Sequence, residues 1–367
     1  KRQNLSSGKS RKADYTADTN VDLDNRRVAV TVSQDHYPYF GASMYPSPQI
    51  QVTAIATSSG SARTCLIVIS ESEKKALLMK GDAFLRANGC VAYSNSKQRR
   101  GISVNNSARL VSDMTCSAGG YKGTARNFNI PPVTNCPSVA DPLAARGELM
   151  NKEVEGLPCD HKDALKFKKT KTTMAPGVYC GDVTIENKSD IELQPGNYVF
   201  REAKLKVTKG SSIKGEKVSI ILDGEGAGLL FKQDTEIGLS APEEGAMAGM
   251  LIYAKRISAE KKERRFKIAS ENANKLTGTV YLPDDTLIIG GDEDADGICD
   301  PEFPGDPPEG VDCETYVGDV SAWTAIVVNK LRVTNGARLN VNSDYSSSTV
   351  PVPEGIGPHS GTVKLVE

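Results

Sequence analysis

The residues with the clearest capacity for chemistry lie in one acidic run between Gly290 and Asp300. Aspartates occupy positions one, three, five and nine of a loop, with a glycine at six and an isoleucine at seven. Oxygens on alternate positions, with glycine at the sharp turn, form the ligand pattern of a calcium loop. We therefore predict a calcium site. Its predicted ligands are Asp292, Asp294, Asp296, the main-chain carbonyl of Ile298, and Asp300.

The rest of this loop leaves alternatives open. Position twelve, where a bidentate glutamate is expected, holds Phe303, so Glu302 or Asp312 would have to substitute. A disulfide between Cys299 and Cys313 would close the loop and restrict its unfolded states. The flanks are not helix-rich, which argues against an EF-hand, and the loop resembles those of thrombospondin type 3 repeats. The alternative is an acidic solubilising loop, although unneutralised carboxylates at this spacing repel one another.

The chain contains eight cysteines and no C-x-x-C motif, which disfavours zinc and thioredoxin-like redox sites. An even number of cysteines that fall into sequential pairs indicates four disulfides formed in an oxidising compartment. Each would contribute about 3 kcal/mol in the chain-entropy model. The alternative is a cytosolic protein with buried thiols. The cysteines are Cys65, Cys90, Cys116, Cys136, Cys159, Cys180, Cys299 and Cys313.

Composition favours a turn-rich β protein. The 367 residues include 33 glycines and 19 prolines, only 6% are aromatic, and the net charge is −1. That balance does not indicate a nucleic-acid partner or a membrane surface. Charge is segregated locally, because residues 284–319 hold thirteen acidic residues and no Lys or Arg. Two basic stretches, Lys162–Lys171 and Lys255–Lys267, are solvated faces, or else they pair with the acidic segment or bind an anionic surface.

The elements that must position this loop repeat along the chain. Pro176-Gly-Val-Tyr179 and Pro195-Gly-Asn-Tyr198 lie 19 residues apart, and alternating apolar residues follow each. Turn and strand units at a period near 20, without helices between them, are typical of a β-solenoid. We predict an all-β fold, a right-handed parallel β-helix, and one short helix over residues 141–151.

Three regions are predicted. Residues 1–25 are polar and are expected to be a linker or the remnant of a truncated N-terminal anchor, and residues 26–60 a small β region with alternating valines. Residues 61–367 are expected to form the disulfide-stapled β-helix, with the acidic calcium loop inserted at 284–319. No apolar stretch is long enough for a transmembrane helix or a signal peptide. If the natural protein is exported, its targeting or anchoring segment is expected to have been removed from this chain.

Catalysis is the competing hypothesis, since many β-helices are polysaccharide lyases or hydrolases with clustered carboxylates. The candidate carboxylates are Asp182, Glu186, Asp190 and Glu192, near Tyr179. Their surroundings are typical of turns and outward strand positions. The histidines His36, His161 and His359 lie far apart, and hydrolase, metalloprotease and P-loop motifs are absent. We therefore predict no catalytic or cofactor-binding residues, and a Tyr-rich loop, 37–45, as a possible contact for binding.

An ordered set of short segments resembles the tight-adherence (Tad/Flp) pilus assembly family, specifically TadG-like proteins. The segments follow a valine-rich arm that precedes Ala56-Thr-Ser and span roughly residues 28–366. They are Cys65-Leu-Ile-Val-Ile, Asn88-Gly-Cys90-Val, Ala175-Pro-Gly-Val-Tyr-Cys-Gly181, Gln194-Pro-Gly-Asn-Tyr-Val199, Leu239-Ser-Ala-Pro242, Thr277-Gly-Thr-Val-Tyr-Leu-Pro283 and Trp323-Thr-Ala-Ile-Val-Val328.

The resemblance implies an envelope protein held by one N-terminal inner-membrane helix, with its bulk in the periplasm or at the cell surface. It implies a non-enzymatic role in pilus assembly, anchoring or surface adhesion, with other pilus or envelope proteins and surface glycans as partners and no nucleic acid. This chain departs from the family by lacking the anchor and by carrying the acidic insertion. The alternative function is that of a carbohydrate-active β-helix enzyme, a polysaccharide lyase or hydrolase.

Overall fold

The computed structural model describes residues 2–5, 9–10, 13–22, 27–35, 49–57, 64–232, 234–257, 263–270, 272–290, 317–334 and 336–357. The chain divides into two compact units, Lys1–Ser61 and Ala62–Glu367.

The first unit is an antiparallel sheet. Its strands are β1 (Arg2–Leu5), β2 (Lys9–Ser10), β3 (Ala13–Asp22), β4 (Arg27–Asp35) and β5 (Gln49–Thr57). The predicted strands with alternating valines correspond to β4 and β5, in which Val32 lies opposite Val52. The linker predicted for residues 1–25 is corrected, because β3 pairs with β4 along most of its length. Tyr, Thr and Val recur in β3 and favour extended backbone, a signal that its polar composition concealed.

The second unit is built from parallel strands that pair in three ladders. We call one pass of the chain through the three ladders a rung, so each rung contributes one segment to every ladder. The first ladder consists of β13 (Leu165–Lys168), β16 (Val183–Glu186), β19 (Lys204–Val207), β22 (Gly228–Phe231), β25 (Arg265–Ile268), the ends of β26 (Asn272–Ile289) and β27 (Thr324–Val333), β7 (Leu77–Met79), β9 (Ile102–Val104) and β11 (Tyr121–Lys122).

The other two ladders follow the same order of rungs. The second contains β14 (Lys171–Met174), β17 (Asp190–Leu193), β20 (Ser212–Gly215), β23 (Glu236–Ser240), the start of β26, β28 (Arg338–Val341), and the starts of β8 (Phe84–Ser94) and β10 (Arg109–Ser117). The third contains β15 (Gly177–Tyr179), β18 (Gly196–Arg201), β21 (Val218–Asp223), β24 (Met250–Ala254), the middle of β26, the start of β27, β6 (Thr64–Val68), the ends of β8 and β10, and β12 (Val133–Thr134).

The Pro-Gly repeat forms a corner of successive rungs. Gly196 has φ of 140°, and a Cβ there would lie 2.7 Å from the Cβ of Pro176 in the neighbouring rung, so only glycine fits. The tyrosine of each repeat closes its own corner, because the Tyr198 hydroxyl donates a hydrogen bond to the carbonyl of Gln194 and the Tyr179 hydroxyl donates to that of Ala175. The repeat found in the sequence therefore marks equivalent positions in adjacent rungs.

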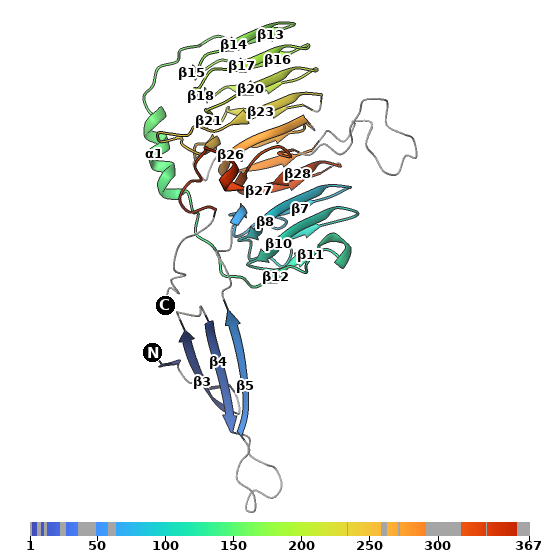
Figure 1. The fold of residues 1–367 in the computed structure, drawn as a ribbon, viewed down its shortest axis with the longest axis vertical. Coiled ribbons are helices and arrows are strands. Elements are labelled where there is room, and N and C mark those ends of the chain that lie inside the picture. Colours follow the sequence, from blue (N-terminus) through green and yellow to red (C-terminus); the bar gives the residue numbers. More distant parts are fainter. Residues whose placement is uncertain are drawn as a thin grey trace, which may run out of the picture. The chain divides into compact units, whose positions relative to one another are not determined.

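The chain enters this stack in the middle. Strand β6 pairs with β27, and the chain then runs through β8 and β10 to β12 at one end (Figure 1). Residues 137–158, which include α1 (Ala144–Val154), carry it along the side of the stack to β13 at the other end. From β13 it runs back to β28, which pairs with β8. Its two halves thus meet at a seam between β27–β28 and β6–β8.

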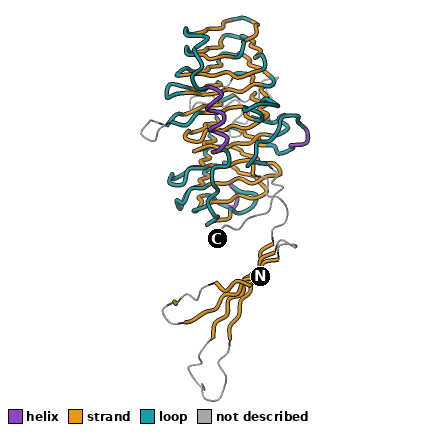
Figure 2. Tube along the Cα trace, turned by 90° about the vertical axis from the view of Figure 1, so that its left-hand side faces the viewer, coloured by secondary structure: helices purple, strands orange, loops and turns teal. Residues whose placement is uncertain are grey.

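Helix α1 covers the outward side of the third ladder (Figure 2). Its buried positions, Leu143, Gly147, Met150 and Val154, recur at the spacing of one helix face. They face an outward column of the ladder in which Tyr253 is 1% exposed. The hydroxyl of Tyr253 donates to the Asn151 side chain at 2.7 Å. The predicted helix over 141–151 therefore exists, displaced by three residues.

The described residues confirm the all-β class, with a large parallel sheet and one α-helix. Two short 3₁₀ helices, Ala125–Asn127 and Tyr345–Ser347, complete the elements. The apolar interior lies between the three ladders and is lined by inward side chains such as Ile185, Val207 and Phe231, none more than 1% exposed. Because no helix connects consecutive strands from β13 to β18, the chain passes through the other two ladders before it returns to the first.

Candidate functional site

All five predicted calcium ligands lie outside the described residues, as do Cys299 and Cys313. The flanks of the insertion are described. Strand β26 ends at Ile289, and Gly290 has φ of 142° with its Cβ direction blocked by the Thr334 carbonyl oxygen at 2.2 Å. The chain rejoins the second ladder at Val317, which bridges to Leu339. Among the described residues, no group of three His, Cys, Asp or Glu side chains is placed to hold a metal ion.

The first two candidate carboxylates lie at the first ladder and are held by lysines. Asp182 accepts hydrogen bonds from the Lys206 ammonium and the Lys204 amide, each at 2.9 Å. Burial alone would raise the pKa of Asp182, but these bonds outweigh it and hold the pKa below its usual value. Glu186 lies among three lysines, and hydrogen bonds from Lys209 first and Lys166 second lower its pKa to about 2. Neither carboxyl is protonated at neutral pH, so neither can act as a general acid.

The other two candidates, Asp190 and Glu192, lie on the outward side of β17 in the second ladder. Both are exposed, and Asp190 accepts a hydrogen bond from the Ser212 hydroxyl at 2.8 Å. Neither is enclosed by an apolar pocket of the kind that surrounds the catalytic acid of a glycoside hydrolase. The structure therefore divides the four candidates between two ladders and brings them into no apolar pocket.

His161 and Tyr179, which lie near the candidate carboxylates in the sequence, pack against other aromatic rings. His161 stacks on Tyr179 with 4.5 Å between ring centroids, and Tyr179 stacks in turn on Phe200. Burial, followed by the charge of Asp160, raises the pKa of Tyr179 to about 12, so its hydroxyl stays protonated at neutral pH. His36, His359 and the Tyr-rich loop 37–45 lie outside the described residues.

A cavity lies where α1 ends against the third ladder. It has a volume of about 150 Å³ and is lined in part by Val154, Leu157, Val178 and Val199. Ligand pockets for small molecules are typically about 300–1,000 Å³. Its lining also includes the polar residues Glu153, Asp160 and Asn197. The Asp160 carboxylate accepts a hydrogen bond from the Val178 amide at 2.8 Å. This cavity is therefore smaller than a typical site for a small-molecule substrate.

Three disulfides confirm the predicted sequential pairing for six of the eight cysteines. They join Cys65 to Cys90, Cys116 to Cys136 and Cys159 to Cys180. The separations of 25, 20 and 21 residues correspond to one rung, so each bridge links a rung to the next. Three such bridges indicate an oxidising environment, such as the periplasm or the cell exterior.

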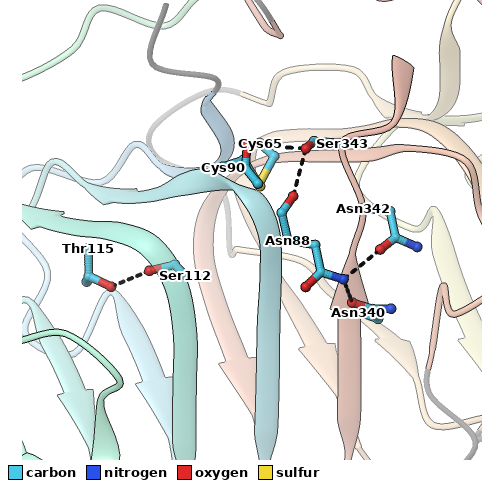
Figure 3. Close-up of a disulfide and its surroundings, with 9 residues drawn as sticks. Cys65, Asn88, Cys90, Ser112, Thr115, Asn340, Asn342 and Ser343 are labelled. Atoms are coloured by element: carbon cyan, nitrogen blue, oxygen red, sulfur yellow. Dashed lines mark hydrogen bonds between the residues drawn. A yellow bond between two sulfur atoms is a disulfide. The ribbon is translucent and has the colours of Figure 1, made fainter. Parts of the chain in front are cut away.

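The seam carries a polar network that the sequence did not suggest (Figure 3). The Asn88 side-chain amide donates to the side-chain oxygens of Asn340 at 3.1 Å and Asn342 at 2.9 Å. The Ser343 hydroxyl donates to the Asn88 carbonyl at 2.7 Å, close to the Cys65–Cys90 disulfide. These partners are more than 250 residues apart, and the excess of Asn and Ser near 340 was the one available signal. The network joins the two halves of the stack.

The buried ion pair between Arg264 and Asp285 was not predicted from the sequence either. Arg264 donates to both carboxylate oxygens of Asp285 at 2.8 Å, and these side chains are 4% and 0% exposed. Burial raises the pKa of Asp285, and the hydrogen bonds from Arg264 oppose this rise. The guanidinium also donates to the carbonyls of Gly224 and Lys255, so it holds a corner of the stack together. The signal for it was the pair Asp284-Asp285 between two apolar segments of one strand.

No helix in the described ranges is long and apolar enough to cross a membrane. The chain matched no family model, no curated protein and no solved structure when it was compared with them.

Proposed function

We propose that this chain is a non-enzymatic component of the tight-adherence (Tad/Flp) pilus system. It acts outside the cytoplasm, at the periplasmic or outer surface of a bacterial envelope, in pilus assembly, anchoring or surface adhesion. In this proposal the three ladders are the faces of a right-handed parallel β-helix. Its partners are other pilus or envelope proteins, and the native form is membrane-anchored through an N-terminal helix.

The observation that carries the non-enzymatic part is the environment of the candidate carboxylates. Hydrogen bonds from neighbouring lysines lower the pKa of Glu186 and of Asp182 and so stabilise their ionised forms. The other two candidates, Asp190 and Glu192, are exposed on another ladder. A glycoside hydrolase needs one carboxyl with a raised pKa beside a second one that is ionised. The three disulfides support a location in an oxidising compartment, and the ordered TadG-like segments support the pilus system.

Localisation tests this proposal most directly. We expect the native protein to fractionate with the envelope and with sheared pili, and its deletion to reduce surface attachment without loss of any glycan-degrading activity. Cytosolic fractionation with reduced cysteines would contradict the proposal. Cleavage of a polysaccharide that is abolished by Asp190→Asn or Glu192→Gln would instead establish the alternative, a carbohydrate-active β-helix enzyme.

Calcium is proposed to brace the acidic insertion through Asp292, Asp294, Asp296, Ile298 and Asp300. We expect calcium to raise the melting temperature and to protect the insertion from proteolysis, because ligand binding stabilises the folded state. The variant Asp294→Ala/Asp296→Ala should lose both effects, whereas Asp190→Ala/Glu192→Ala, with the same loss of charge elsewhere, should keep them. Identical melting and proteolysis with calcium and with chelator would contradict the site.

A further inference from the structure

The outward side of the first ladder is strongly cationic. Its first seven strands, from β13 to the end of β27, contain eight Lys or Arg residues and one acidic residue, Glu186. The cations alternate with inward apolar residues, as strand geometry requires. They are Lys166, Lys168, Lys204, Lys206, Arg265, Lys267, Lys330 and Arg332.

These cations lie on every second rung. The strands β13, β19, β25 and β27 each contribute two, and the intervening strands β16, β22 and β26 contribute none. Strand register aligns one column in the order Lys166, Thr184, Lys206, Leu230, Lys267, Ile288, Arg332. Strands lie about 4.8 Å apart, so cations in this column repeat at about 9.6 Å along the stack.

Some of these charges are already neutralised within the protein. Glu186 binds Lys166 and Lys168, and Lys206 shares its charge with Asp182. Lys330 is 13% exposed and lies between Glu73 and Glu263.

The cations that reach solvent begin at the third rung. Lys204 and Arg265 are exposed, and Lys206, Lys267 and Arg332 are half-buried. The second ladder differs, because its lysines lie beside acidic residues of neighbouring strands, as Lys214 does beside Glu236 at 2.7 Å. Residues 291–316 hold ten acidic and no basic residues, so the rest of the chain carries a formal charge of +9. Within this part of the chain, the strands that form the face of the first ladder have a larger excess of cations over acidic residues than the strands of the second ladder.

We propose that this face binds a linear anionic polysaccharide that carries one acidic group on every second sugar. A charge on alternate sugars matches cations on alternate rungs, because one pyranose ring extends its polymer by about 5 Å, close to the distance between neighbouring strands. Two sugars therefore span about the distance between two cation-bearing rungs. The uncharged sugars would lie over Thr184, Leu230 and Ile288, whose side chains offer apolar or hydroxyl surface. The choice of a glycan over a nucleic acid rests on the extracytoplasmic location in the proposed function.

Binding to hyaluronan oligosaccharides, which carry a uronate on every second sugar, tests this proposal. We expect an oligosaccharide of eight sugars to bind the full chain in calorimetry, more weakly as salt is raised. Lys206→Ala/Lys267→Ala/Arg332→Ala should raise Kd about tenfold, since three ionic contacts of ordinary strength are lost. The matched control, Lys171→Ala/Lys214→Ala/Lys275→Ala, removes the same charge from the second ladder and should leave Kd within about twofold of the original.

Several outcomes would overturn the proposal. Equal losses in the two triple variants would assign binding to net charge and not to this face. Equal binding of neutral dextran, or tighter binding of duplex DNA or of anionic phospholipid vesicles, would exclude an alternating-charge glycan as the partner. Circular dichroism of each variant establishes that it is folded. A negative result here leaves the pilus localisation experiment unaffected, so failure of the binding site and failure of the proposed function are distinguishable.

Discussion

Lysines close to Glu186 determine the pKa of its carboxyl group. Hydrogen bonds from Lys209, Lys166 and Lys168 lower its pKa from 4.5 to about 2. A lowered carboxyl pKa means that the ionised form stabilises the fold. This stabilisation is fully present above about pH 4.5 and is lost as pH falls through about 2.

We therefore expect Glu186→Gln to melt at a lower temperature than the parent protein at pH 7 and at the same temperature near pH 2. The matched change is Glu192→Gln, an exposed glutamate on the adjacent ladder, which should melt at pH 7 close to the temperature of the parent. Melting curves followed by circular dichroism from pH 7 to pH 2 measure both. A difference between Glu186→Gln and the parent that does not shrink on acidification would contradict the assignment.

The Arg264–Asp285 pair is expected to dominate the stability of its corner. Removing one partner leaves a buried charge without compensation, so Arg264→Ala should cost about 3–5 kcal/mol of unfolding free energy. Lys275→Ala, which breaks the exposed pair with Glu216, should cost about 0–1 kcal/mol. The double change Arg264→Met/Asp285→Leu should recover much of the loss. Urea titrations of the four proteins measure this, and equal midpoints for Arg264→Ala and Lys275→Ala would refute it.

At the scale of the element, α1 is held against the third ladder by its apolar face. Met150 is fully buried against the third ladder, whereas its neighbour Leu149 is 57% exposed. Met150→Ala should therefore cost about 2–5 kcal/mol, through lost burial and a cavity. Leu149→Ala should change the unfolding free energy by no more than about 0.5 kcal/mol. Chemical denaturation distinguishes the two, and similar values would mean that α1 is not docked as described.

The insertion and the seam show two ways in which elements depart from the repeat. Strand β26 is long because it continues from one ladder through the next two. It ends at Ile289, just before Gly290, where a side chain would collide with Thr334. At the seam, Asn88, Asn340 and Asn342 provide hydrogen bonds between strands that are distant in sequence. Regular strand pairing thus continues across the seam, where neighbouring strands are distant in sequence.

At the scale of the whole molecule, we expect the second unit to stay assembled when the chain is cut within residues 137–158, the segment that connects its two ends. Leu157 and Pro158 are exposed, and replacing them with a protease site would divide the chain between β12 and β13. The fragments should remain together, because β6 and β8 pair with β27 and β28. Each of the three disulfides lies within one fragment, so none holds the fragments together.

Native gel filtration of the cut protein should therefore give a single peak at the mass of the uncut chain. A non-reducing denaturing gel should give two bands. Two native peaks would contradict the seam, and one denaturing band would reveal a disulfide between the fragments. The protein with the inserted site but without protease is the control.

The sequence by itself determined the features that repeat locally. The β class, the Pro-Gly corners and three disulfides were predicted because one rung is about 20 residues long, so partners in adjacent rungs are near in sequence. Polar composition misled the prediction at β3, because strand pairing there uses backbone groups that composition does not reveal.

Only the tertiary structure decided which rungs meet across the seam and which cations share a column. Lys206, Lys267 and Arg332 are separated by unequal loops, so no sequence period relates them, although strand register aligns them. The same holds for Asn88 and Asn340, which are 252 residues apart. Hydrogen bonding between parallel strands depends on which backbones lie side by side, and the length of chain between them leaves that open.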